Sequence, residues 1–97
     1  MLPAQPVYIS LNPGKSFRRG DRHHHISLIQ AMLQLLSRVY SQFPDLGLTG
    51  QFDGPTEEAV RLLQTLSGLP VNGILDKNTW KYLVLHHALA ADTLENR

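Results

Sequence analysis

Apolar residues recur every three or four positions in three stretches of the chain, which is the spacing of one face of a helix. The stretches cover residues 26–42, 56–67 and about 78–90. The first must end before Pro44, because the residue that precedes a proline avoids the α-helical region. Gly68 follows the second stretch, where a helix often closes on a left-handed residue. The pattern predicts an all-α fold, a small three-helix bundle.

A short motif occurs twice, each time directly before one of the last two predicted helices. Each copy consists of glycine, any residue, an apolar residue, aspartate, two further residues and threonine, and the copies begin at Gly50 and Gly73. The aspartates, Asp53 and Asp76, are placed to accept hydrogen bonds from backbone amides of the first helical turn. The motif predicts two pseudo-repeated loop-helix units that pack on the first helix.

The N-terminal part of the chain is interrupted by residues that oppose regular structure. The first 20 residues contain three prolines and two glycines. Such a composition favours an extended segment. We therefore expect an extended lead-in or linker at residues 1–16, the three-helix domain at 17–90 and a polar, frayed tail at 91–97.

Composition restricts the class of protein. The chain has 97 residues, of which 42% are hydrophobic, and it contains no cysteine. That length supports one small core, and the lack of cysteine excludes a disulfide, a cysteine nucleophile and a cysteine metal site. A domain of this size has little room for a deep catalytic cleft, and no spacing marks a nucleophile with its base. We expect a non-catalytic module without a cofactor.

The small net charge of +1 conceals an uneven distribution. Residues 1–40 carry a net charge of +4, with four basic residues in the segment KSFRRGDR at 15–22, whereas residues 41–97 carry −3. A basic segment can contact phosphate, so a nucleic-acid-binding domain is one hypothesis. The third predicted helix has too few charges to read a DNA groove. We therefore expect a solvated basic surface and no nucleic acid partner.

Neither a membrane span nor a secretory signal is predicted. No stretch approaches the roughly 18 apolar residues that a span requires. Residues 1–10 lack the basic start and the long apolar region of a signal peptide. We expect either a protein that works inside the cell or a module of a longer chain whose signal lies elsewhere.

A series of motifs over residues 13–85 follows the order and spacing of one small family. The motifs are FRRGD at 17–21, IQAML at 29–33, TGQF at 49–52, TEEAVRLLQ at 56–64, GLPVNGIL at 68–75 and TWKYL at 79–83. With them the chain resembles the peptidoglycan-binding domain family, the three-helix module found beside cell-wall hydrolases and spore-cortex-lytic enzymes.

The resemblance implies a non-catalytic module that binds peptidoglycan of the cell wall or spore cortex and targets or tethers a partner domain. Its partners would be a glycan strand or stem peptide and a covalently linked hydrolase domain. Its location would be extracytoplasmic, at the wall or spore, as part of a longer exported chain.

The alternative is a structural or protein-interaction helical bundle that kept the fold and lost the glycan ligand. Thr49 and Asn72 suggest it, because they stand where the family has the aspartate of each Asp-Gly turn. Asparagine preserves the side-chain turn of aspartate better than threonine does. We therefore expect the turn at Asn72 to be kept and the turn at Thr49 to be weaker.

A glycan strand with peptide stems is polar, extended and carboxylated, so amide, hydroxyl, basic and aromatic side chains suit it. The candidates on the loop-rich side and flanking helices are Thr49, Gln51, Arg61, Asn72, Asn78 and Tyr82. Trp80 falls on an apolar stripe with Leu83 and Val84 and is expected in the core.

Histidines occur in two adjacent groups, at 23–25 and 86–87. Consecutive residues of a helix point about 100° apart. The three histidines of the first group therefore cannot all face one ion from a regular helix. We expect a surface or helix-capping role for them and no metal site.

Overall fold

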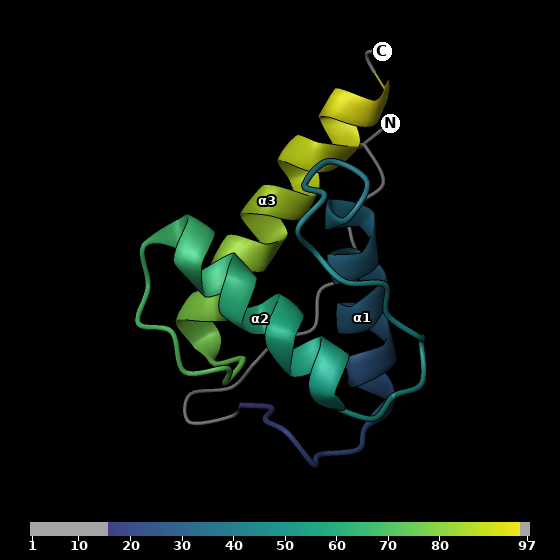
Figure 1. Cartoon of the computed structure of the whole chain (residues 1–97), viewed down its shortest axis with the longest axis vertical. Coiled ribbons are helices and arrows are strands. Elements are labelled where there is room, and N and C mark those ends of the chain that lie inside the picture. The colour runs from purple at the N-terminus through teal and green to yellow at the C-terminus, as the bar shows by residue number, and fades with distance from the viewer. Residues whose placement is uncertain (1–15, 96–97) are drawn as a thin grey trace, which may run out of the picture.

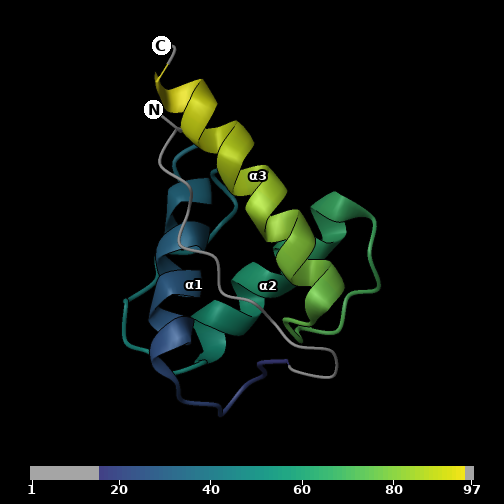
Figure 2. The same cartoon turned by 180° about the vertical axis from the view of Figure 1, so that it is seen from behind.

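Three helices surround one core in the computed structural model, which describes residues 16–95 (Figure 1). Helix α1 spans His24–Leu36, α2 spans Gly54–Ser67 and α3 spans Lys77–Glu95. Helix α3 contacts both α1 and α2, and seen from behind it runs diagonally past α1 (Figure 2). The described residues contain isolated β-bridges but no strand. The predicted all-α three-helix bundle is confirmed.

The core takes apolar residues from all three helices and from the loops that precede α2 and α3. Leu33, Leu63 and Leu83 come from α1, α2 and α3 in turn, and all are fully buried. Phe52 and Leu75 occupy the apolar position of the repeated motif and are 1% and 0% exposed. Each copy of the motif therefore anchors its loop in the core.

The segment before α1 binds to both of these loops. The backbone N–H of Leu75 donates to the carbonyl of Phe17 at 2.8 Å, and the N–H of Phe17 donates back at 3.1 Å. Four residues further on, the carbonyl of Asp21 accepts from the N–H of Phe52 at 2.8 Å. This segment therefore joins the two loops at one end of the bundle.

Helix α1 begins at His24, and His23 is its N-cap. His23 has extended backbone angles of −166° and 147°, and its Nδ1 accepts a hydrogen bond from the N–H of His25 at 3.0 Å. The expected capping role is confirmed for His23. His23 lies outside the regular helix that our expectation of diverging rings assumed, and one ligand nitrogen from each ring lies within 4.8 Å of the others.

Helix α1 ends at Leu36 rather than at the predicted residue 42. Ser37 Oγ donates to the carbonyl of Gln34 at 2.6 Å, and the chain leaves the helix in a turn. Phe43 and Leu46 are buried although they lie in the loop that follows. The apolar spacing after Leu36 therefore reflects a packed loop, not further helix.

Helix α2 closely follows its predicted bounds. Asp53 Oδ1 accepts from the N–H of Thr56 at 3.1 Å and from its hydroxyl at 2.6 Å. Gly68 ends the helix in the left-handed region, with φ of 71°. Both end signals of this helix are confirmed.

Helix α3 is longer than predicted. It continues to Glu95 instead of ending at Ala90, the predicted last residue, which is 3% exposed. Residues 91–95, predicted as part of a frayed tail, are helical, whereas nearly all of the lead-in predicted at 1–16 lies outside the described residues. Trp80 packs partly buried against the core, as expected. Within residues 16–95, no helix combines the length and apolarity that a membrane span needs.

Candidate functional site

Gln30 of α1 is a fully buried amide that holds the loop before α2. Its Oε1 accepts from the backbone N–H groups of Thr49 and Gly50 at 2.8 and 3.0 Å. Its Nε2 donates at 2.9 Å to the carbonyl of Gln51 and at 2.9 Å to Thr56 Oγ1. One side chain thus satisfies polar groups at both ends of the first motif copy.

Gln64 of α2 holds the loop before α3 in the same manner. Its Oε1 accepts from the N–H groups of Asn72 and Gly73, each at 3.0 Å. Its Nε2 donates to the carbonyl of Ile74 and to Thr79 Oγ1, each at 3.0 Å. The two loop-helix units are therefore equivalent in their hydrogen bonds as well as in sequence, and the predicted pseudo-repeat is confirmed.

Sequence reasoning did not select these glutamines as key residues of the loops. The motif repeats at constant internal spacing, but Gln30 lies 19 residues before Thr49, whereas Gln64 lies 8 residues before Asn72. The longer loop after α1 hides the correspondence. One signal was available in the sequence, because each glutamine directly follows an apolar residue of a buried helix face. An unpaired amide in such a place is costly, so each glutamine should have been expected to have hydrogen-bond partners.

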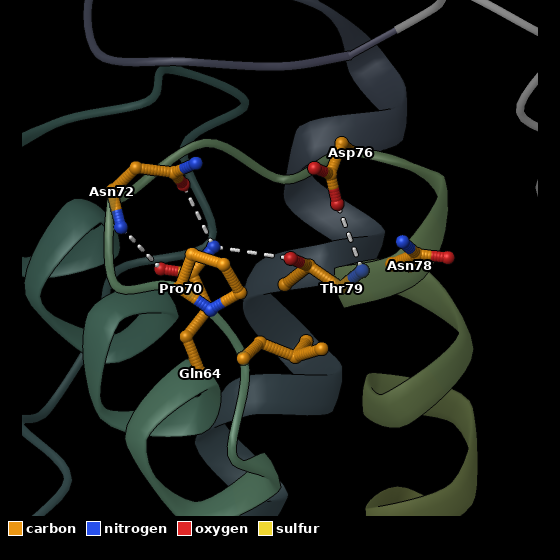
Figure 3. Close-up of a pocket in the computed structure, with 7 residues that line it drawn as sticks. Gln64, Pro70, Asn72, Asp76, Asn78 and Thr79 are labelled. Atoms are coloured by element: carbon orange, nitrogen blue, oxygen red, sulfur yellow. Dashed lines mark hydrogen bonds between the residues drawn. The ribbon is translucent and has the colours of Figure 1, made fainter.

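A small open cavity lies between the end of α2, the second loop and the start of α3 (Figure 3). Its volume is about 100 Å³. It is lined by Gln64, Leu69, Pro70, Asn72, Asp76, Asn78 and Thr79. Most of these side chains carry an amide, hydroxyl or carboxylate group, so the cavity offers hydrogen bonds more than apolar contact.

Asp76 is the charged residue of this cavity. Its Oδ1 accepts from the N–H of Thr79 at 2.9 Å, which caps the start of α3 (Figure 3). Its second carboxylate oxygen makes no hydrogen bond within the described part of the chain. A carboxylate accepts several hydrogen bonds. Asp76 can therefore cap the helix and accept from a ligand at the same time.

Thr49 and Asn72, which stand where the resemblance implies turn aspartates, both support their turns. Asn72 Oδ1 accepts from the N–H of Ile74 at 2.9 Å, and Thr49 Oγ1 accepts from the N–H of Gln51 at 3.1 Å. The turn expected at Asn72 is confirmed. The turn expected to be weaker at Thr49 also forms, so neither substitution opens its loop.

The structure brings together only some of the candidate ligand-binding residues. Asn72 and Asn78 line the cavity. Thr49 and Gln51 lie in the other loop, at the equivalent end of the first unit. Tyr82 is half-buried on α3 and does not line the cavity.

Arg61 lies on α2 beside the cavity-bearing loop. Its Nη2 is 3.9 Å from Glu57 Oε2, and Arg19 Nη1 is 3.2 Å from Glu57 Oε1. Two guanidinium groups share one carboxylate, so this cluster keeps a positive charge. A Cβ atom on Gly73 would lie 3.1 Å from Arg61 Nε, which places the Arg61 side chain against the second loop.

Comparisons with known proteins bear on the family of the chain. No curated protein and no solved structure matches it significantly. A family model described as a peptidoglycan binding domain matches residues 23–83, well over half of the chain. The match includes α1, both repeated loops, α2 and the first part of α3. The chain therefore belongs to the peptidoglycan-binding domain family.

Proposed function

We propose that the domain binds peptidoglycan at the cavity between α2 and α3, as a non-catalytic module that targets or tethers a partner domain. Family membership supports peptidoglycan as the ligand. The observation that carries the position of the site is the polar lining of the cavity, to which Asn72, Asp76 and Asn78 contribute.

The size of the cavity restricts the part of the ligand that enters it. Pockets that bury a whole small molecule measure roughly 300–1,000 Å³. This cavity measures about 100 Å³, which is too small for a sugar ring. It has room for one substituent, such as an acetamido group or a side-chain amine of a stem peptide. We infer that the strand lies across the surface and inserts one group.

Free polar atoms around the cavity suit such a group. Asn72 uses its Oδ1 within the loop, and its Nδ2 makes no hydrogen bond to any described residue. Nδ2 is then a donor for a ligand carbonyl, and the free oxygen of Asp76 is an acceptor for a ligand N–H or ammonium. Asn78 is exposed at the rim and adds a second amide.

Arg61 supplies the positive charge for a stem-peptide carboxylate. Its contact with Glu57 is long, at 3.9 Å, and its side chain is 46% exposed. Exposed ion pairs of this kind contribute little to stability. Exchange of this contact for a bidentate bond to a ligand carboxylate therefore costs little and gains a charge-assisted pair.

The proposal extends to location and partner. A module that binds peptidoglycan acts at the cell wall or spore, so we place it outside the cytoplasm, as part of a longer exported chain. We propose a covalently linked hydrolase domain as the partner, because a module without catalytic groups acts by holding another activity near its substrate.

Sedimentation of the whole chain with purified sacculi at low salt tests this function. We expect the unaltered chain to be retained and a double variant, Arg61→Gln with Asn78→Ala, to be retained less. Gln51→Ala is the matched control, because its side chain is exposed on the loop without the cavity. No retention of the unaltered chain counts against peptidoglycan binding. Full retention of the double variant places the site elsewhere.

A second candidate function is binding to another protein. Leu85 and Leu89 lie one turn apart on α3 and are 49% and 55% exposed. Contiguous exposed apolar patches mark protein contact surfaces, and we propose that these two leucines belong to one. If this surface binds a protein, the double variant Leu85→Glu with Leu89→Glu should abolish the binding of that partner. Added muropeptide should then have no effect on the binding. Displacement of the protein partner by muropeptide would instead support peptidoglycan as the ligand.

A further inference from the structure

Three imidazole rings gather at the start of α1, away from the cavity. The ring centroids of His23 and His24 are 4.4 Å apart, those of His23 and His25 are 4.5 Å apart, and those of His24 and His25 are 4.3 Å apart. This is possible because His23 precedes the helix with an extended backbone. Its ring therefore does not follow the angular spacing of the helix.

The backbone that carries these rings is held in place. The N–H of His23 donates to the carbonyl of Gly50 at 2.9 Å, and the ring of Phe17 lies 5.6 Å from that of His23. His23 and His25 are half-buried, whereas His24 is exposed. The cluster therefore has two partly anchored rings and one ring that is open to solvent.

We propose that His23, His24 and His25 bind a divalent transition metal ion of the zinc or copper class. One ligand nitrogen from each ring already lies within 4.8 Å of the others. Tetrahedral zinc with bonds near 2.0–2.1 Å requires nitrogens ~3.4 Å apart. Coordination requires side-chain rotations that close this difference, and the remaining positions on the ion are left to water.

The donor set selects the class of ion. Imidazole nitrogens suit zinc, copper and nickel, whereas calcium and magnesium prefer oxygen ligands. The three ligands of this cluster include no carboxylate. The positive end of α1 and the neighbouring Arg22 oppose a cation. We therefore expect weaker binding than at a structural zinc site with four protein ligands.

His23 takes part in a hydrogen bond that competes with the metal. A neutral imidazole has one free lone pair, and that of His23 Nδ1 accepts from the N–H of His25 at 3.0 Å. Coordination by His23 therefore releases this cap. Asparagine is among the best N-cap residues but offers no imidazole nitrogen. His23→Asn thus separates the capping role from the ligand role.

Calorimetric titration of the whole, tag-free chain with ZnCl₂, repeated with CuCl₂, tests the proposal. We expect one ion per chain and a higher unfolding temperature with the ion, because the folded state binds it in preference. We expect His24→Ala to weaken binding at least about tenfold, since one of three ligands is lost. His23→Asn should weaken binding similarly while the metal-free chain stays folded by circular dichroism.

The other histidines provide the matched control. A His86→Gln and His87→Gln double variant should bind the ion as the unaltered chain does. The proposal is overturned by absence of binding with either ion, by unchanged affinity in His24→Ala, or by loss of binding in the His86 and His87 variant. It is also overturned if the ion leaves the unfolding temperature unchanged, because an unfolded chain would then bind equally well.

Discussion

Gln30 in α1 and Gln64 in α2 make the same set of hydrogen bonds to two different loops. Each Oε1 accepts from two consecutive backbone N–H groups. Each Nε2 donates to a backbone carbonyl and to the threonine hydroxyl at the end of the motif. The exposed fractions of the two residues are 0% and 1%. Each buried amide therefore satisfies backbone groups of its own loop, and Gln64 also lines the cavity.

Replacement of Gln64 with leucine should be costly although its size is nearly kept. Gln64→Leu leaves the N–H groups of Asn72 and Gly73 without an acceptor. Each buried group left unsatisfied costs about 1–3 kcal/mol, so we expect a loss of roughly 2–4 kcal/mol in the free energy of unfolding. Urea denaturation measures it, with the exposed loop residue in Gln42→Ala as a control that changes little. A loss below about 1 kcal/mol would show that Gln64 does not hold the loop.

Local signals predicted most of the fold, and the errors arose where burial and helix do not coincide. The cap at Asp53 and the stop at Gly68 are local, and both are as expected. Phe43 is buried although it lies in a loop. Its apolar side chain continued the helical spacing in the sequence beyond the true end of α1. None of residues 91–95 is buried, so no apolar period marked the last turn of α3, which was predicted too short.

The cavity was predicted only in part. Asn72 and Asn78 were candidates because they lie in a turn-rich loop and at the start of a helix. Asp76 was predicted only as a helix cap, and it does cap α3. Its carboxylate also lines the cavity, together with Leu69 and Pro70 from the loop before α3. This arrangement in space cannot be predicted from the spacing of residues along the chain.

Gly73 should tolerate alanine less well than Gly20 does. Both have positive φ, at 75° and 97°, where a side chain is strained. A Cβ on Gly73 would also lie 3.0 Å from Glu57 Cγ and 3.1 Å from Arg61 Nε, whereas a Cβ on Gly20 meets nothing within 4 Å. We expect Gly20→Ala to cost about 1 kcal/mol and Gly73→Ala clearly more, measured by thermal unfolding. Equal losses of stability in the two variants would mean that the side chains of Glu57 and Arg61 move aside to make room.

Stability should fall as the pH drops below about 6.5, with His87 as one cause. Burial lowers the pKa of His87 below its usual value of 6.5. At a pH between the pKa of His87 in the folded chain and its higher pKa in the unfolded chain, the unfolded chain binds a proton that the folded chain does not. A lower pH therefore favours unfolding. Urea unfolding at about pH 7.5 and 5.5 measures the effect, and His87→Gln should reduce the difference. An unchanged difference in that variant would assign the pH dependence to other groups.

Asp76 and Asp53 cap equivalent helices, but only Asp76 lines the cavity, so the pair separates ligand binding from capping. Asn keeps a capping oxygen and removes the charge, so Asp76→Asn and Asp53→Asn should each lose less than about 1 kcal/mol of stability. If Asp76 accepts from the ligand, its variant exchanges a charge-assisted hydrogen bond for a neutral one. Retention on sacculi should then weaken roughly fivefold for Asp76→Asn and stay unchanged for Asp53→Asn. Equal weakening in both variants would show that the carboxylate acts only through the helix that it caps.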